Sequence, residues 1–248
     1  MKKNIFSVKN VLRALAIVGV LGLLVFGAFK VIAYGIVAST PLISIDEIQQ
    51  MADQEDYEGA IKSCKRRLLA DANEYSTLTL LGSLYEENSE PRNAEAVYRK
   101  LLKDNEDDPT LHFYLGRSLF HKNEIEAAVK SLNASIALAE KSFPAEEVKE
   151  ILSMNYGLLG EIYVEHTKEY RKAIAELQKF LNLDPANPEA RYQLATAYAY
   201  SSQYQNAFKE FDKIIKENPN TEIAKLAENA IQYVREKRNP GKSKVLLD

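Results

Sequence analysis

The sequence has 248 residues, of which 46% are hydrophobic and 27% charged, and its formal net charge is −3. Residues 1–38 hold five of the 32 Lys and Arg residues and none of the 35 Asp and Glu residues, so the remainder carries 27 basic against 35 acidic residues, a net charge of −8. This balance argues against a nucleic-acid-binding protein, because phosphate binding needs a concentrated basic surface. The single cysteine excludes an intrachain disulfide.

An uncharged apolar segment follows the basic start of the chain. Residues 14–29 form a run of 16 residues without a charge, and eight more uncharged residues follow Lys30. Sixteen helical residues span roughly 24 Å, less than the hydrocarbon core of a bilayer, so we expect the helix to continue past Lys30. We predict a basic cytoplasmic N-terminus over 1–13 and a transmembrane signal-anchor helix over 14–38. The rest of the chain is then expected outside the cytoplasm, because a positive flank stays on the cytoplasmic side.

Cleavage of this segment as a secretory signal peptide is the alternative. The basic start and the apolar run both fit a signal peptide. The best small-residue cleavage site is Ala33-x-Gly35, which lies just after Lys30. Both interpretations place the remaining chain outside the cytoplasm.

The first helix beyond this segment is predicted from a capping box. Ser44 precedes Glu47 by three residues, the spacing at which each side chain bonds the backbone amide of the other residue. Ile48, Met51 and Ala52 follow at helical spacing and give this helix one apolar face.

The chain then repeats a structural unit of 34 residues. Ala60, Ala94 and Ala128 are 34 residues apart, as are Gly82 and Gly116. This period indicates consecutive helix pairs, each of which buries its apolar face against the next pair. The later packing positions are Leu115, Gly116, Leu119, Ala128 and Leu132, then Leu159, Gly160, Tyr163, Ala173, Leu177 and Phe180, then Leu194, Ala195, Tyr198, Ala207, Phe211 and Ile214.

Two positions depart from this period. The unit that contains Gly160 has one extra residue, which we expect in the turn over 166–169, because insertions are tolerated in turns. Gly116 and Gly160 are 44 residues apart, which places a ten-residue insertion over 143–152. Because Pro144 can begin a helix, we expect the next first helix to start early and run long. The insertion is either a docking ridge or a structural extension that packs on its neighbour.

Helix starts are marked by a capping residue followed by proline. Asp108-Pro109 and Asn187-Pro188 both have this arrangement, in which the capping side chain bonds backbone amides of the first turn and proline takes the first helical position. We expect a helix to begin at each pair.

The chain is predicted to end in one more helix. Apolar residues recur at steps of three and four over 222–238, which predicts an amphipathic helix that caps the last pair. Residues 239–248 are predicted to form a flexible tail. Cys64 occupies a packing position of the first unit, so we interpret it as a buried small apolar residue.

The order of Leu-Gly, aromatic, Ala, aromatic and Pro in these units resembles the tetratricopeptide repeat family. The resemblance covers about residues 43 to 237, and it implies an all-α fold, a right-handed superhelix (α-solenoid) of helix hairpins, preceded here by one transmembrane helix. The predicted parts after the anchor are a divergent first repeat at 43–74, repeats at 75–108 and 109–142, the insertion at 143–152, repeats at 153–187 and 188–221, the capping helix at 222–238 and the tail at 239–248.

The resemblance also implies a peptide-binding groove, because in this family the first helix of each pair lines the inner surface. Carried over by spacing, the groove residues are Phe113, Arg117, Phe120, His121, Glu161, Val164, Tyr192, Thr196 and Tyr200. Exposed aromatic side chains with a few charges suit an extended or helical peptide. The alternative is that these aromatics pack against the next unit.

The function implied by the resemblance is that of bacterial envelope proteins of this repeat family. We expect a non-catalytic scaffold, single-pass in the inner membrane with its repeats in the periplasm, which supports the assembly, secretion or chaperoning of envelope protein complexes. Its partners are expected to be proteins or peptides, with no small-molecule substrate, cofactor or metal. The alternatives are a soluble periplasmic chaperone after cleavage and an organelle outer-membrane receptor with cytosolic repeats.

Overall fold

The computed structural model describes residues 42–238, and this part of the chain is helical without strands. The predicted N-terminal segment 1–13, the predicted membrane helix 14–38 and the tail 239–248 lie outside the described residues. Of the helices within 42–238, none combines the length and the apolar character needed to cross a bilayer. The chain divides into two compact units, Met1–Thr77 and Leu78–Asp248.

The first unit contains the helices α2 (Ile45–Asp53) and α3 (Tyr57–Ala70), which pack against each other. The predicted capping box is present at the start of α2: the backbone N–H of Glu47 donates to Ser44 Oγ at 3.1 Å, and the N–H of Ser44 donates to Glu47 Oε2 at 2.8 Å. Ile48 and Cys64 are fully buried. The burial of Cys64 agrees with a packing role and raises the pKa of its thiol to about 11.

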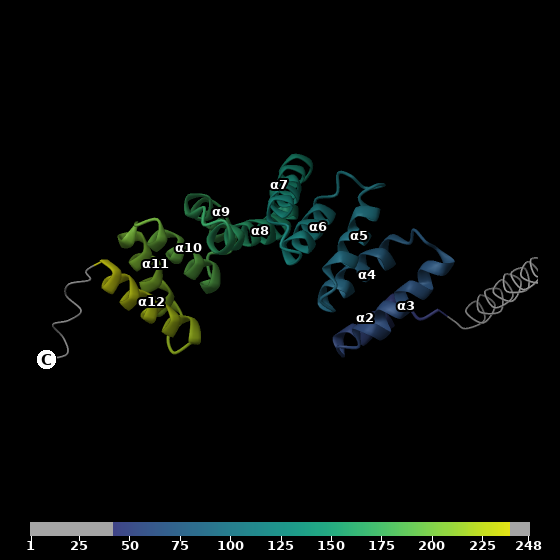
Figure 1. Cartoon of the computed structure of the whole chain (residues 1–248), viewed down its shortest axis with the longest axis horizontal. Helices are drawn as coiled ribbons and strands as arrows, with labels where there is room; N and C mark the ends of the chain where they lie inside the picture. Colours follow the sequence, from purple (N-terminus) through teal and green to yellow (C-terminus); the bar gives the residue numbers. More distant parts are fainter. Residues whose placement is uncertain (1–41, 239–248) are drawn as a thin grey trace, which may run out of the picture. The chain divides into compact units, whose positions relative to one another are not determined.

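The second unit is a series of helix hairpins, each packed on the next in chain order (Figure 1). Helix α4 (Tyr75–Glu87) begins in the first unit and runs into the second, where α5 (Pro91–Leu101) follows it. The first helices of successive pairs also contact one another: α6 contacts α8, and α8 contacts α10. The later elements are α6 (Pro109–His121), α7 (Ile125–Ser142), α8 (Ala145–Glu161), η1 (Ile162–His166), α9 (Tyr170–Leu183), α10 (Pro188–Tyr200), α11 (Tyr204–Glu217) and α12 (Glu222–Arg238).

The glycines of the repeat mark the closest approach of the two helices of a pair. A Cβ atom at Gly82 would lie 2.5 Å from Cε1 of Tyr98, and one at Gly116 would lie 2.8 Å from Leu132 Cδ2. Tyr98 and Leu132 are fully buried. A large side chain of the second helix therefore fills the space above each glycine, as the 34-residue period predicts.

The turn inside each hairpin has one residue in the left-handed region, five positions before the packing alanine. Examples are Ser89 before Ala94, with φ 57°, and Asn123 before Ala128, with φ 62°. These residues end the first helix and direct the chain back along it. The same geometry recurs at Glu55, Lys168 and Ser202.

The extra residue of the Gly160 unit does not lie in the turn, so that expectation is wrong. Lys168 is five residues before Ala173, as in the other units, and the turn has its ordinary length. The additional residue is taken up within the first helix, where Ile162–His166 forms a π-helical turn. A π-turn contains one residue more than an α-helical turn, so the hairpin geometry after it is unchanged.

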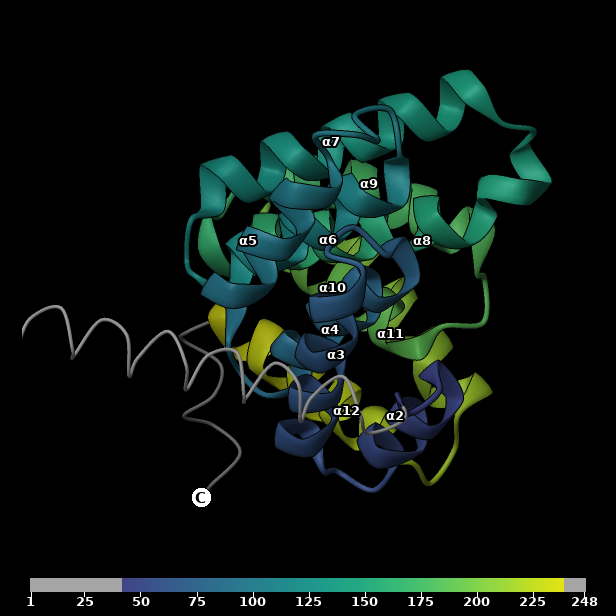
Figure 2. The same cartoon turned by 90° about the vertical axis from the view of Figure 1, so that its right-hand side faces the viewer.

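The ten-residue insertion lengthens two helices and leaves a short connection between them. Helix α7 has 18 residues and α8 has 17, against 13 in α6. Only Phe143 and Pro144 join the two helices. Helix α8 begins directly after Pro144, so the expectation of an early start and a long helix is confirmed, while the lengthening of α7 was not foreseen. Figure 2 shows this connection projecting beyond the neighbouring hairpins of the second unit.

Both predicted proline starts are present. Asp108 Oδ1 accepts from the backbone N–H groups of Thr110 and Leu111 at 2.8 and 3.2 Å. Asn187 Oδ1 accepts from the N–H of Ala190 at 2.9 Å. Each cap satisfies amides that have no partner within the helix, and the capping residue and proline together fix where α6 and α10 begin.

Candidate functional site

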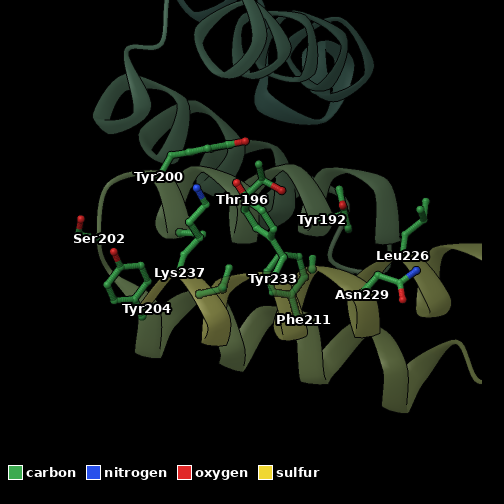
Figure 3. A pocket seen from close by; sticks show the side chains of 13 residues that line it. Tyr192, Thr196, Tyr200, Ser202, Tyr204, Phe211, Leu226, Asn229, Tyr233 and Lys237 are labelled. Atoms are coloured by element: carbon green, nitrogen blue, oxygen red, sulfur yellow. The ribbon is translucent and has the colours of Figure 1, made fainter. Parts of the chain in front are cut away.

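The candidate site is an open pocket of about 540 Å³ between α10, α11 and α12 (Figure 3). Tyr192, Thr196 and Tyr200 are spaced by four residues, so they lie on one face of α10. Helix α12 contributes the opposite wall. The lining residues are Tyr192, Thr196, Ala199, Tyr200, Ser202, Tyr204, Phe211, Leu226, Asn229, Ala230, Tyr233, Val234 and Lys237.

Helix α12 closes the pocket because it packs as an additional first helix. It contacts α11 and also α10, in the way that α10 contacts α8. Ala224, Ala227 and Ile231 are buried by these contacts. Leu226 and Tyr233 lie on the other side of α12 and remain 42% and 53% exposed. Exposed large apolar side chains that line a concave surface are typical of a binding site.

The aromatic side chains of the pocket are held by ring contacts. The ring of Tyr200 stacks on Tyr170 of α9, with centroids 5.1 Å apart and an angle of 17° between the planes, yet Tyr200 is 58% exposed. The ring of Tyr192 meets buried Phe211 edge-on at 5.5 Å. These contacts restrict the rings before any partner arrives, which lowers the entropic cost of binding.

Polar groups are few and lie on both walls. Figure 3 shows Tyr233 and Lys237 of α12 directed toward α10, where Thr196 and Tyr200 lie. The ammonium of Lys237 is 5.6 Å from the centroid of the Tyr233 ring. Burial, with smaller contributions from nearby Tyr200 and Glu165, raises the pKa of Tyr192. The Tyr192 hydroxyl is therefore a neutral donor and acceptor at neutral pH, and Lys237 is the basic residue of the lining.

Phe113 and Val164 are only 3% and 2% exposed. The expectation that these two predicted groove residues line an open surface is therefore wrong. Phe113 points into the helix packing, where its ring lies 5.5 Å from that of Tyr114. Val164 belongs to the π-helical turn and is buried there. The alternative of aromatic packing holds for Phe113.

Arg117, also predicted for the groove, is bound within the fold. Its Nε donates to Glu86 Oε2 at 2.9 Å, and its Nη2 forms an ion pair with the same carboxylate. Ser118 Oγ donates to the other oxygen of Glu86 at 2.7 Å. The guanidinium also lies 5.1 Å from the ring centroid of Tyr114. Arg117 therefore connects α4 to α6 and is not free for a ligand.

The remaining predicted residues do not join the pocket. Phe120 is half-buried, and its ring meets His166 edge-on at 5.0 Å. His121 is exposed and lines a separate polar hollow beside the turn at Ser89. Glu161 is half-buried at the end of α8. Only Tyr192, Thr196 and Tyr200 of the predicted set are brought together in one pocket, and peptide binding there remains a prediction.

The residues of α12 that line the pocket are not among the predicted groove residues. Leu226, Tyr233 and Lys237 were placed on a capping helix and were not considered as groove residues. The signal was present: Leu226, Tyr233 and Lys237 follow one another at steps of seven and four residues, which puts them on one helical face. A capping helix is expected to have polar residues on its outer face. Leucine and tyrosine at these positions instead indicate that this face contacts another part of the protein or a partner.

Comparison with known proteins supports the repeat architecture. One tetratricopeptide repeat family model matches residues 79–143 and a second matches residues 167–234, so that together they span more than half of the chain. Among solved structures, the chain is similar to MamA, with a TM-score of 0.60 and 26% identity over 71% of this chain and 96% of that one. YrrB, described as a tetratricopeptide repeat protein with an unusual peptide-binding site, has a TM-score of 0.57 and 19% identity over 81% of this chain and 97% of that one.

Two curated relatives match over shorter stretches. Cellulose synthase operon protein C of Pseudomonas fluorescens is 30% identical over 128 residues, which is 51% of this chain and 10% of that protein. Nuclear autoantigenic sperm protein of Homo sapiens is 37% identical over 90 residues, 32% of this chain and 11% of that protein. The chain thus spans about a tenth of the length of these relatives. The family models, the recurring hairpins and the glycine contacts agree, and the chain belongs to the tetratricopeptide repeat family.

Proposed function

We propose that this chain is a non-catalytic scaffold that binds a peptide segment of a partner protein in the pocket between α10, α11 and α12. The observation that carries this proposal is the exposed aromatic wall of the pocket. Tyr200 and Tyr233 face it from two helices, and both are more than half exposed. Such side chains supply a large contact area at a low entropic cost, and they are typical centres of binding energy.

The pocket favours a segment with one large apolar side chain. Leu226 and the rings of Tyr192 and Tyr233 form the apolar surface that this side chain would cover. Thr196 and Asn229 offer hydrogen-bonding groups for the backbone of an extended or helical peptide. Lys237 favours a carboxylate or a carbonyl oxygen of the partner at the C-terminal end of α12. The peptide-binding site described for YrrB supports a peptide as the occupant.

Crosslinked pull-down of the full chain tests this proposal. We expect a partner that is recovered with the wild type and is reduced about tenfold or more with Tyr200→Ala/Tyr233→Ala, since two aromatic anchors are lost. Tyr75→Ala is the matched control, because Tyr75 is also exposed, at 43%, and lies outside the pocket. Recovery of the same partners with the double variant and the wild type, at equal helical content, contradicts the proposal.

The location that we propose is the bacterial inner membrane, with the repeats in the periplasm. The support is the uncharged run over 14–38, its basic flank over 1–13 and the acidic residues that follow. In this position the scaffold serves the assembly, secretion or chaperoning of envelope protein complexes. Protease added to intact spheroplasts is expected to digest the repeats, and protection of the repeats contradicts this orientation.

The two alternatives, a cleaved soluble periplasmic chain and an organelle outer-membrane receptor, are distinguished from the anchored protein by N-terminal sequencing and by protease accessibility. N-terminal sequencing of the mature protein distinguishes anchor from signal peptide: a retained anchor keeps Lys2 and Lys3 with the membrane fraction, whereas cleavage gives a soluble chain that begins after the segment Ala33-x-Gly35. An organelle receptor has cytosolic repeats, which protease removes from intact organelles. In each case the proposed pocket and its peptide segment stay the same.

A further inference from the structure

We propose a second docking surface on the projecting α7–α8 connection, which binds a partner segment carrying an aromatic or apolar side chain flanked by Lys or Arg. The surface is a groove of about 400 Å³ between the start of α6 and the first turns of α8. Its lining includes Tyr114, Phe143, Glu147, Glu150, Ile151 and Met154. It lies apart from the α10–α12 pocket and shares no lining residue with it.

The insertion creates this groove. Helices α7 and α8, with 18 and 17 residues, are longer than α6 and α9, with 13 and 14, so their ends extend past the neighbouring hairpins (Figure 2). Phe143, in the two-residue connection, is 44% exposed with an extended backbone at φ −134° and ψ 152°. A large apolar side chain at the tip of a projecting hairpin is exposed to water. A bound partner would cover it, and this favours binding at the tip.

The groove is held in place by polar contacts below it. Asn155 is fully buried on α8, and its Nδ2 donates to Ser135 Oγ of α7 at 2.9 Å and to the carbonyl of Ile151 at 2.7 Å. Ser135 Oγ in turn donates to the carbonyl of Pro109 at the start of α6, at 2.6 Å. This network joins α6 and α8, which line the groove, through Ser135 of α7, so the surface is formed before a partner binds.

The charges of the groove identify the partner's chemistry. Glu147 and Glu150 are the charged residues of its described lining, and within residues 42–238 neither has an ion-pair partner. Asp108 already accepts from the first amides of α6, so these amides are not available to an anion. Lys149 lies one step round α8, in an adjoining hollow with Glu146 and Asp184. Two exposed carboxylates around an apolar floor therefore favour a cationic segment.

Arg117 lies near the groove but does not reverse the negative electrostatic potential of the groove. Its guanidinium is 5.1 Å from the ring centroid of Tyr114 and forms an ion pair with Glu86. Glu86 neutralises that charge. The groove therefore keeps the negative potential of Glu147 and Glu150.

A photo-crosslinking peptide tests the proposal on the full chain. The probe has p-benzoylphenylalanine between two pairs of lysines, with a glycine at each end, and its twin has glutamate in place of each lysine. We expect the lysine probe to label Met154 or Phe143 and the glutamate twin to label neither. Labelling is expected to fall with added salt, because the carboxylates are exposed.

Two double variants distinguish binding at this groove from a general effect of the negative charge of the protein. Glu147→Gln/Glu150→Gln is expected to reduce labelling about fivefold, the effect of losing two exposed ion pairs. Glu126→Gln/Glu189→Gln removes the same charge from the first turns of α7 and α10, and labelling is expected to stay within about twofold of the wild type. Equal labelling by the two probes, or an equal loss in the two double variants, overturns the proposal.

The test also distinguishes this surface from the α10–α12 pocket. Tyr200→Ala/Tyr233→Ala is expected to leave the labelling of Met154 unchanged. If the probe labels residues of α10 or α12 instead of Met154, the groove at Phe143 is not a docking surface for a cationic segment, while peptide binding in the pocket still stands.

Discussion

The backbone N–H of Thr167 donates to the carbonyl of Ile162, five residues earlier, at 3.1 Å. This hydrogen bond closes the π-helical turn that follows α8, in the unit that contains Gly160. It adds one residue to the helix and lets the turn at Lys168 keep the same distance from Ala173 as in the other units. The repeat thus absorbs an insertion inside a helix without disturbing the hairpin.

Deletion of Glu165 is expected to convert the π-turn into ordinary α-helix. Glu165 is exposed and lies five residues after Gly160, so its removal restores the spacing of the other units. We expect the melting temperature to change by less than about 3 °C, measured by circular dichroism. Deletion of His121, the last residue of α6 and five residues after Gly116, is the control, because α6 has no extra residue and the turn at Asn123 is rotated by about 100° about the helix axis. This deletion is expected to destabilise the hairpin of α6 and α7. Equal losses in the two deletions would contradict this account of the π-turn.

The pairing of Arg117 with Glu86 is expected to be important for stability. The side chain of Glu86 is 4% exposed, and that of Arg117 is 29% exposed. Arg117→Ala leaves a buried carboxylate without its cation, so we expect the free energy of unfolding to fall by about 2–4 kcal/mol. Urea unfolding at neutral pH measures this loss. Glu86→Gln/Arg117→Met removes both charges and is expected to lose less than the single variant, and a larger loss in the double variant would contradict the argument.

Alanine substitution is expected to be destabilising at Gly82 and nearly neutral at Gly157. At Gly82 a Cβ would lie 2.5 Å from the ring of Tyr98, which is fully buried and cannot move aside without disturbing the core. Gly82→Ala is therefore expected to destabilise the fold by about 1–3 kcal/mol. At Gly157 the nearest ring atom, of Phe180, is 3.1 Å away, and Phe180 is only half-buried. Gly157→Ala is expected to be nearly neutral, because alanine favours the helix by about 0.5–1 kcal/mol. Urea unfolding of both variants gives the comparison.

Stability is expected to fall in acid partly through Glu95. Burial of this carboxylate raises its pKa, but hydrogen bonds from Lys122 and Arg99 outweigh burial, and the pKa of Glu95 is lowered below its ordinary 4.5. A carboxylate with a lowered pKa in the folded state contributes its full stability above the unfolded pKa and loses it as the pH falls through the folded pKa. Between about pH 6 and about pH 3, the wild type should therefore lose more stability than Glu95→Gln, by on the order of 1 kcal/mol.

The control for the acid prediction is Glu126→Gln, since Glu126 is exposed in the first turn of α7. Its acid loss is expected to match that of the wild type. If Glu95→Gln and the wild type lose the same amount of stability in this range, the contribution of the Lys122 pair is negligible.

Much of this fold was predictable because its signals are local. The glycines that meet Tyr98 and Leu132 recur at the period of the repeat, and the side chains of Asp108 and Asn187 satisfy the first amides of α6 and α10. Each signal depends on residues within one hairpin, so the spacing in the sequence is sufficient to identify it.

The remaining features depend on tertiary contacts that spacing does not reveal. The extra residue near Gly160 is equally compatible with a longer turn and a π-turn, and the choice depends on the packing of buried Ile162 and Val164. Phe113 is aromatic at a groove position of the repeat, yet it turns into the core beside Tyr114. For the same reason the predicted groove residues include the α10 wall of the pocket and not the α12 wall, because the contact of α12 with α10 exists only in three dimensions.

The most direct test of the central claim is site-specific photo-crosslinking in cells, with p-benzoylphenylalanine replacing Tyr200, Tyr233 or Gln205 in turn. Tyr200 and Tyr233 face the pocket from α10 and α12, whereas Gln205 is exposed on α11 outside it. The account predicts that one partner polypeptide is crosslinked from both tyrosine positions and not from Gln205. Crosslinks from Gln205 to the same polypeptide, with none from Tyr200 or Tyr233, would contradict it.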